Sequence, residues 1–473
     1  MSARAVLWTD AEAAAATGGR ASARFAARGV SIDTRTLAQD DLYCAIEGVS
    51  QDGHQYVAAA FKAGAAAALV QKGRIAKPDG PVLEVADTLE GLRGLGRAAR
   101  TRSKAKIAAI TGSVGKTGTK EALRAVLAAQ ASTHASEGSL NNHWGAPLSL
   151  ARMPRDAAYG IFELGMNHPG EIAPLAELVR PHVALITWIA PAHTAFFKSV
   201  AEIADAKAEI FAGMEGGTAV LPRDSEYYER LRRAAEKAGI KRVISFGANK
   251  ASDARLVDAD LGATQSTVTA DILGTRLRYT IGSPGQHWVA NSLAVLATAH
   301  ALGADLAKAA AALAQVQPPK GRGARQRVAL AKGTFTLIDE SYNASPEAVR
   351  AALATLALAA PEPGGRRIAV LGDMRELGDE ADALHEALAP SFVAAKVDKV
   401  FTCGPHTAAL DAALPKELRG AHAADSTALL PEVTQAIRAG DVVMVKGSLG
   451  SKMAPIVQAL LALGRASPTK SGS

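Results

Sequence analysis

Residues 107–117 read Ile-Ala-Ala-Ile-Thr-Gly-Ser-Val-Gly-Lys-Thr, and they are the most informative segment of the chain. Its apolar start predicts a buried strand over 107–110, and the residues that follow Thr117 are typical of a helix. Glycines between the two let backbone N–H groups surround a phosphate, to which the helix N-terminus adds a partial positive charge. We expect Lys116 to reach the β- and γ-phosphates and the Thr117 hydroxyl to bind Mg²⁺. Ile110 stands where the general phosphate-loop pattern has glycine, so this loop is a variant.

The sequence around this loop alternates strands and helices. Apolar runs suitable for strands occur at 107–110, 159–162, 183–189 and 218–221, with helix-like segments between them. The Ala- and Leu-rich stretch 288–315 predicts two helices that are separated at Gly303. Such an alternation predicts a parallel sheet with helices on both faces.

Both flanks of this central part have the same α/β character. Before it, strand-like runs at 42–46, 67–70 and 81–85 precede a helical stretch over 88–104; after it, strands recur at 334–338, 367–371, 398–402 and 441–445. Prolines and glycines punctuate 318–323, which we interpret as an interdomain hinge. We therefore predict the α/β class with three domains: a small α/β N-terminal domain over 1–104, a central phosphate-loop parallel-sheet ATPase domain over 105–319, and a C-terminal Rossmann-like domain over 320–473.

The composition excludes several classes of protein. With 48% hydrophobic and 21% charged residues, the chain is not a disordered one. It has no long uninterrupted apolar run and no apolar leader segment, so we expect a cytoplasmic protein without a transmembrane helix. Basic residues outnumber acidic ones by 53 to 46 but form no long run, which favours phosphorylated small molecules over nucleic acid as partners. Cys44 and Cys403 are expected to be buried reduced thiols.

Several polar residues of the central part follow predicted strands. Glu163 ends the strand after the phosphate loop, where an acid faces bound Mg²⁺ in phosphate-loop proteins, although alone it would read as a surface acid. His193 follows the next strand. Lys207 falls among the apolar positions of a helix, as either a surface lysine or an inward-facing one with a lowered pKa. Asn141 and Asn142 suit either a substrate-contacting loop or an Asx turn.

Three polar loops of the last third also follow strands. They contain Asp339 and Asn343, the stretch Gly372–Gly378, and Lys446 with Ser448. In an open α/β sheet, ligands bind beyond the carboxyl ends of the strands. The three loops therefore predict a second ligand-facing surface.

These motifs cover nearly the whole chain, and with them the chain resembles the Mur ligases. The similarity rests on the Thr-Gly-Ser-Val-Gly-Lys-Thr loop, on Glu163 in Glu-Leu-Gly-Met-Asn-His-Pro-Gly-Glu, and on Lys207 in Ala-Lys-Ala-Glu-Ile. It extends to Asp-Thr-Arg at 33–35 and to Asp-Glu-Ser-Tyr-Asn at 339–343. The Gly-Asp-Met-x-Glu-Leu-Gly and Lys-Gly-Ser motifs resemble those of the D-alanyl-D-alanine-adding members of the family.

The resemblance implies a role for each candidate residue. Its implied catalytic residues are Lys116, His193 and Lys207, the last of them carbamylated. The residues implied to contact ATP are Gly112, Ser113, Val114, Gly115, Lys116, Thr117, Gly118, Asn291, Arg322, Asp339 and Asn343. The residues implied to bind the other substrates are Asp33, Thr34, Arg35, Asp52, His54, Asn141, Asn142, Lys446 and Ser448. The implied Mg²⁺ ligands are Thr117, Glu163 and His193.

The resemblance also implies a reaction. It is the ATP-dependent joining of D-alanyl-D-alanine to UDP-N-acetylmuramoyl-tripeptide through an acyl phosphate, a cytoplasmic step of peptidoglycan synthesis. The alternatives are another Mur-type amino-acid ligase and a folylpolyglutamate synthetase-like ligase, and more distantly a GTPase or a non-enzymatic nucleotide sensor. We expect a monomer that neither inserts into a membrane nor binds nucleic acid.

Four positions depart from the pattern of the Mur ligases. Gly118 stands where serine or threonine is frequent, and Ser139 where asparagine is frequent. Ala195 lies in a segment that usually reads Leu-Glu, and Leu449 replaces a frequent arginine. These positions concern details of the metal and dipeptide contacts and leave the class of reaction unchanged.

Overall fold

A nine-stranded sheet forms the centre of the computed structural model, which describes residues 4–48, 51–192 and 194–464. Its strand order is β16-β15-β14-β13-β12-β11-β8-β10-β9, so the strand before the phosphate loop, β8, lies inside the sheet. The strands are β8 (Lys106–Thr111), β9 (Thr133–Ala135), β10 (Tyr159–Glu163), β11 (Val183–Ile186), β12 (Thr218–Pro222), β13 (Arg242–Gly247), β14 (Ala254–Leu261), β15 (Ser266–Ile272) and β16 (Thr275–Ile281).

The sheet is parallel only in part. From β9 to β14 neighbouring strands pair in parallel, as expected. The prediction of a parallel sheet is wrong for residues 254–281, where β14, β15 and β16 form an antiparallel meander. Every second residue of β15 is buried, as is usual for an antiparallel strand with one covered face. Leu273 and Gly274, with φ of 51° and 85°, make the tight turn that reverses the chain.

Helices cover both faces of the central sheet because alternate residues of β8 point to opposite sides. Ala108 and Ile110 pack in one core with α4 (Lys116–Ala128), α9 (Gln286–Ala301) and α10 (Leu306–Ala312). Ile107 and Ala109 pack in the other with α5 (Gly145–Ala151), α6 (Ile172–Val179), α7 (Val200–Ala208) and α8 (Tyr228–Lys237). Gly303, at φ 77°, lies between α9 and α10, which confirms the two predicted helices.

The N-terminal unit contains a five-stranded sheet of order β2-β7-β6-β5-β4. Its strands are β2 (Arg20–Ala21), β4 (Gly29–Ser31), β5 (Asp41–Cys44), β6 (Ala67–Gln71) and β7 (Val82–Val85), and β1 (Trp8–Thr9) pairs separately with β3 (Ala26–Ala27). Its helices are α1 (Asp10–Thr17), α2 (Val57–Lys62) and α3 (Thr88–Arg102). The last of these helices packs against α5, so it joins the unit to the central one.

The C-terminal unit contains a six-stranded sheet of order β17-β18-β22-β19-β20-β21. It is parallel except for the edge strand β17, which pairs antiparallel with β18. The strands are β17 (Ala324–Ala329), β18 (Thr334–Glu340), β19 (Arg367–Gly372), β20 (Lys399–Cys403), β21 (Arg419–Ala423) and β22 (Val442–Lys446). The helices are α11 (Pro346–Leu358), α12 (Ala381–Glu386), α13 (Ala389–Ala394), α14 (Thr407–Ala413), α15 (Ser426–Ala436) and α16 (Ala454–Leu463).

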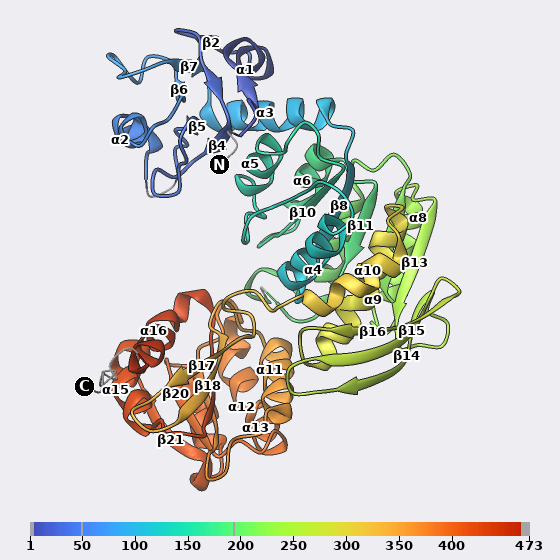
Figure 1. The fold of residues 1–473 in the computed structure, drawn as a ribbon, viewed down its shortest axis with the longest axis vertical. Coiled ribbons are helices and arrows are strands. Elements are labelled where there is room, and N and C mark those ends of the chain that lie inside the picture. Colours follow the sequence, from blue (N-terminus) through green and yellow to red (C-terminus); the bar gives the residue numbers. More distant parts are fainter. Residues whose placement is uncertain (1–3, 49–50, 193, 465–473) are drawn as a thin grey trace, which may run out of the picture.

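Three α/β units thus follow one another along the chain, and the N- and C-terminal units adjoin the central one at separate places (Figure 1). The predicted α/β class is confirmed, while the borders at 104/105 and 319/320 stay predictions. Within the described part of the chain, no helix is both long and apolar enough to cross a membrane. Cys44 and Cys403 are buried free thiols, as expected.

Candidate active site

A cavity of about 1430 Å³ lies at the carboxyl ends of the central strands. Its walls come from the phosphate loop, from the segments after β10 and β11, and from the start of α9. The C-terminal unit adds Arg322, Tyr342 and Lys446 to the same cavity, and α3 adds Arg93 and Arg97. A ligand in this cavity would therefore touch segments that lie far apart in the sequence.

The phosphate loop is held in shape by the segment that follows β11. Gly112 adopts φ 146°, and a Cβ there would lie 2.1 Å from the Oγ1 of Thr187. The same hydroxyl donates to the carbonyl oxygen of Val114 at 2.6 Å. The Ser113 hydroxyl donates to the carbonyl of Ala190 at 2.9 Å and accepts from its N–H at 3.1 Å. The predicted strand, loop and helix are thus present, and the segment that follows β11 fixes the loop between them.

Lys116 begins helix α4 and curls back over the loop. Its Nζ donates to the carbonyl oxygen of Gly112 at 2.6 Å. Burial lowers the pKa of Lys116, while the nearby Glu163 carboxylate opposes that change. An ammonium group that donates only to loop carbonyls can donate to phosphate oxygens instead, because these are stronger acceptors.

Three buried oxygen atoms of cavity-lining residues have no partner within the described residues: the Oε2 of Glu347 on α11, and two that belong to the start of α4 and the end of β10. Of these last two, one is the Oγ1 of Thr117 and the other is the Oε2 of Glu163, whose side chain is almost completely buried. The Oε1 of Glu163 accepts a 2.8 Å hydrogen bond from the Nδ2 of Asn141. Because unpaired buried oxygens are costly and hard cations prefer hydroxyl and carboxylate ligands, these two residues fit a Mg²⁺ site. His193, the third predicted ligand, lies outside the described residues.

Lys207 faces inward from α7 and is 1% exposed, so the alternative of a surface lysine is wrong. Burial lowers the pKa of Lys207 well below its usual value, and the nearby Lys116 lowers it further. The carboxylates of Glu209, Glu171 and Glu163 act in the opposite direction. A lysine with a lowered pKa is partly a neutral amine, which is the nucleophilic form of the group.

The two asparagines behave differently from each other. Asn142 forms the Asx turn that was one of its two alternatives, since its Oδ1 accepts from the backbone N–H groups of Trp144 and Gly145. Asn141 instead holds the carboxylate of Glu163. Both line the cavity, and both belong to the connecting loop, residues 136–142, which runs between β9 and α5.

The other residues predicted to contact ATP fall into two groups. Asn291 lines the cavity across from Gly115, and Arg322 lines it with its guanidinium stacked 4.4 Å over the ring of Tyr342. Asn343 lines it as well. Asp339 does not; its carboxylate accepts from the backbone of Gly321 and from the N–H and hydroxyl of Ser341. Asp339 therefore shapes the loops that carry the cavity-lining residues.

Lys446 and Ser448 follow β22. The Nζ of Lys446 lies 3.1 Å from the Oε2 of Glu340 and donates to the carbonyl oxygen of Asn343 at 3.0 Å, and Lys446 lines the cavity. Ser448 is buried beside it and accepts the N–H of Arg375 at 2.9 Å. The serine thus holds an arginine that lines the cavity mouth.

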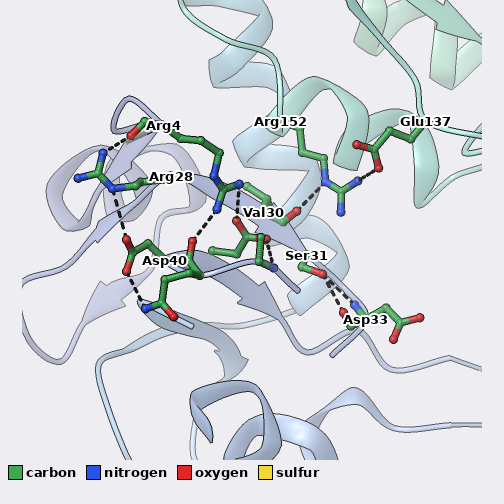
Figure 2. A network of polar contacts seen from close by, with 11 residues as sticks. Arg4, Arg28, Val30, Ser31, Asp33, Asp40, Glu137 and Arg152 are labelled. Carbon is green, nitrogen blue, oxygen red and sulfur yellow. Dashed lines mark hydrogen bonds and ion pairs between the residues drawn. The ribbon is translucent and has the colours of Figure 1, made fainter. Parts of the chain in front are cut away.

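The five N-terminal candidates lie apart from this cavity, which none of them lines. Asp33 binds Arg35 through both carboxylate oxygens, which lowers the pKa of Asp33, and Thr34 lies between them. Figure 2 shows Asp33 beside Ser31 at the end of β4. His54 uses both ring nitrogens, one toward Asp52 at 2.6 Å and one accepting the N–H of Gln71 at 3.0 Å. Their predicted contact with the UDP-sugar end stays a prediction.

Sequence reasoning missed several residues of the cavity and its supports. They are Arg93, Arg97, Lys120, His143, Trp188, Trp288, Tyr342 and Arg375. Three of them belong to or follow motifs quoted above: Tyr342 is the tyrosine of Asp-Glu-Ser-Tyr-Asn, Arg375 is the variable position of Gly-Asp-Met-x-Glu-Leu-Gly, and Lys120 lies one helical turn after Lys116. Arg93 and Arg97 are one turn apart on α3, a spacing that marks one helix face.

Three family models match successive parts of the chain. Residues 27–100 match "Mur ligase family, catalytic domain", residues 110–299 match "Mur ligase middle domain", and residues 324–449 match "Mur ligase, glutamate ligase domain". The chain is 35% identical over 441 residues to the UDP-N-acetylmuramoyl-tripeptide–D-alanyl-D-alanine ligase of Escherichia coli, covering 91% of this chain and 93% of that one.

Another relative and a solved structure agree with this match. The ligase of the same name from Rickettsia prowazekii is 33% identical over 429 residues, covering 90% of this chain and 94% of that one. The crystal structure of MurF from Acinetobacter baumannii aligns with a TM-score of 0.82 at 29% identity, covering 96% of this chain and 99% of the other. The similarity therefore spans all three units.

Replacing Gly112 by alanine is expected to weaken ATP binding by about tenfold or more, because a side chain is strained at this φ and would displace Thr187. Isothermal titration calorimetry with ATP measures the effect. Gly73→Ala is the matched control, since Gly73 also has a positive φ, 77°, but nothing within 4 Å of the added carbon. Wild-type affinity in Gly112→Ala would show that Thr187 does not fix the loop.

Proposed function

The chain belongs to the Mur ligase family, and from that premise we propose that it joins D-alanyl-D-alanine to UDP-N-acetylmuramoyl-tripeptide at the expense of ATP. The observation that carries the proposal is the cavity in which the phosphate loop meets the unpaired oxygens of Thr117 and Glu163. Relatives that share about a third of their residues with this chain over nearly its whole length bear the name of this ligase. The other Mur-type and folylpolyglutamate-type alternatives have no such support.

The reaction proceeds in two steps, formation of an acyl phosphate and formation of the amide. The terminal carboxylate of the tripeptide attacks the γ-phosphorus of ATP, so that a carboxyl O–P bond forms and the bond to ADP breaks. The amine of the dipeptide then attacks the acyl carbon, the amide C–N bond forms, phosphate leaves and the amine loses a proton. The difficulty is electrostatic, because a carboxylate must approach a polyphosphate.

The residues of the cavity reduce this repulsion. The ammonium group of Lys116 exchanges its hydrogen bond to the Gly112 carbonyl for hydrogen bonds to the β- and γ-phosphates. The N–H groups of the loop bind the phosphate oxygens as well. Thr117 and Glu163 would hold Mg²⁺, with His193 as the further ligand that the similarity to the Mur ligases implies. When bound, Mg²⁺ supplies positive charge that offsets the repulsion between the two anions.

Lys207 takes part after modification by carbon dioxide. Its neutral amine attacks the carbon of CO₂, a C–N bond forms and one proton is released, which leaves a carbamate. The lowered pKa of Lys207 makes the neutral amine available for this step. The carbamate carries a negative charge in place of the positive one, so it can orient a cation beside Lys116 and Glu163.

The three units divide the substrates among them. We assign the UDP-sugar end to the N-terminal unit, ATP and Mg²⁺ to the central unit, and closure over the dipeptide to the C-terminal unit. Segment 318–323 is the proposed pivot, and closure excludes the water that would hydrolyse the acyl phosphate. The protein is proposed to act as a monomer on these small anionic substrates, without nucleic acid.

Phosphate release from ATP should require both substrates. With purified protein and UDP-N-acetylmuramoyl-tripeptide, we expect steady release only when D-alanyl-D-alanine is added, together with a product that is heavier by the dipeptide. A phosphate-release assay coupled to mass spectrometry tests this, with D-glutamate or meso-diaminopimelate as alternative amines. Release that ignores the dipeptide, or that prefers another amine, would refute the proposed function.

Lys116→Ala and Glu163→Ala should each lower the rate of ligation by at least about 100-fold, because each removes a charge that stabilises the transition state. Initial rates of dipeptide-dependent phosphate release measure the loss, and circular dichroism checks that the fold is kept. Arg124→Ala serves as a control, since this exposed arginine on α4 pairs with Glu121 and does not line the main cavity. Near-native rates in either active-site variant would remove that residue from the mechanism.

Lys207→Ala should be inactive and should regain part of its activity when short carboxylates such as formate or acetate are added. The added anion replaces the charge of the carbamate inside the cavity left by the side chain. The measurement is ligation rate against carboxylate concentration, with chloride at equal ionic strength as the comparison. Absence of rescue, together with an unmodified amine in an electron-density map, would argue against the carbamate.

A further inference from the structure

Lys120 is a fully buried lysine for which the proposed reaction has no role. It lies on α4 and is 0% exposed. Its Nζ donates to the carbonyl oxygens of Ser136 and Gly138, both at 2.6 Å, and lies 3.0 Å from the Oε1 of Glu121. All three N–H groups of the ammonium are therefore used. Removing one partner from such a buried charge strongly destabilises the fold. The contacts of Lys120 therefore hold the segments that carry its partners firmly in place.

The two carbonyls belong to the connecting loop, and this loop holds Glu163. The hydroxyl of Ser136 accepts the backbone N–H of Glu163 at 3.1 Å. Asn141 donates to the Oε1 of Glu163 at 2.8 Å, and its carbonyl accepts the N–H of Gly165 at 2.8 Å. The loop thus fixes both the main chain and one carboxylate oxygen of Glu163. This arrangement determines the direction of the other carboxylate oxygen, Oε2, which has no partner among the described residues.

The same loop is linked to the N-terminal unit through Arg152 and contacts the C-terminal unit directly. Glu137 pairs with Arg152 at 2.6 Å, and Arg152 donates to the carbonyl of Val30 in the N-terminal unit at 2.6 Å (Figure 2). The hydroxyl of Ser139 contacts the hydroxyl of Tyr342 in the C-terminal unit. Lys120 connects this loop to the helix that starts at the phosphate loop. It therefore links the nucleotide-binding helix to the acid that completes the site.

We propose that Lys120 is a positioning residue that sets the direction of the Glu163 carboxylate relative to Thr117. It does so by holding the carbonyls of Ser136 and Gly138, and the affinity of the site for a divalent cation depends on it. The inference rests on the proposed function, since that function assigns the cation to Thr117 and Glu163. Residues that orient a metal ligand typically change metal affinity by about 10- to 100-fold when they are replaced.

The test is direct measurement of metal binding without turnover. Free Mn²⁺ is titrated by electron paramagnetic resonance into the full chain in the presence of a non-hydrolysable ATP analogue. Lys120→Met keeps the length of the side chain and removes the ammonium. We expect its Mn²⁺ dissociation constant to rise at least about tenfold, while affinity for the analogue without metal stays within about threefold of wild type.

Lys106→Met is the matched control. The Nζ of Lys106 also donates to a backbone carbonyl of the central unit, that of Leu302 at 2.8 Å, but Lys106 begins β8 at the end away from the phosphate loop. Its Mn²⁺ affinity should equal that of the wild type. An unchanged Mn²⁺ affinity in Lys120→Met, or an equal loss in Lys106→Met, would overturn the proposal.

Ser136→Ala covers the case in which Lys120→Met does not fold. This substitution leaves Lys120 and both carbonyls in place. It removes only the hydroxyl that accepts a hydrogen bond from the N–H of Glu163. Its Mn²⁺ dissociation constant should also rise, and a wild-type value would overturn the proposal. The ligation assay on the wild-type protein tests the proposed function separately from the role of Lys120. Phosphate release that does not depend on the dipeptide would refute the proposed function, whatever the Mn²⁺ titrations show.

Discussion

The close approach of Gly112 to Thr187 fixes the phosphate loop, and the candidate active site is arranged around that loop. The hydroxyl of Thr187 occupies the space where a side-chain carbon of residue 112 would lie, and it also binds the carbonyl of Val114. The loop is therefore fixed by the segment after the neighbouring strand and not by its own glycines alone. Its N–H groups keep their direction in the absence of a ligand, so little reorganisation is needed when phosphate arrives.

The electrostatics of the cavity are balanced by pairing. Lys116 and Lys207 lie near Glu163, and Lys446 lies against Glu340. Burial lowers the pKa of both Lys116 and Lys207, and the charge of Lys116 lowers the pKa of Lys207 further. Conversion of Lys207 into an anion would remove this repulsion and leave Lys116 free to bind phosphate. The structure thus gives an electrostatic reason why the two lysines would differ in chemical state.

The parts of the structure that sequence predicted are those with local causes. The strand, loop and helix at 106–128 follow from an apolar run, two glycines and a helical pattern. The apolar neighbours of Lys207 made an inward-facing side chain one of two alternatives, and the burial of Lys207 decides between them. The antiparallel meander at 254–281 was not predicted, because its strands are half exposed and carry many polar residues. The tasks of Lys120 and Tyr342 depend on partners 16 and 203 residues away, which no local pattern contains.

The burial of both thiols has a practical consequence for the study of motion between the three units. Cys44 and Cys403 are at most 2% exposed, and burial raises the pKa of each thiol to about 12. Since thiolates are the species that react with maleimides, maleimide dyes should label the two natural cysteines very slowly. Cysteines introduced on the surfaces of two units would then carry the only labels, and energy transfer between them would report the distance between the units in solution.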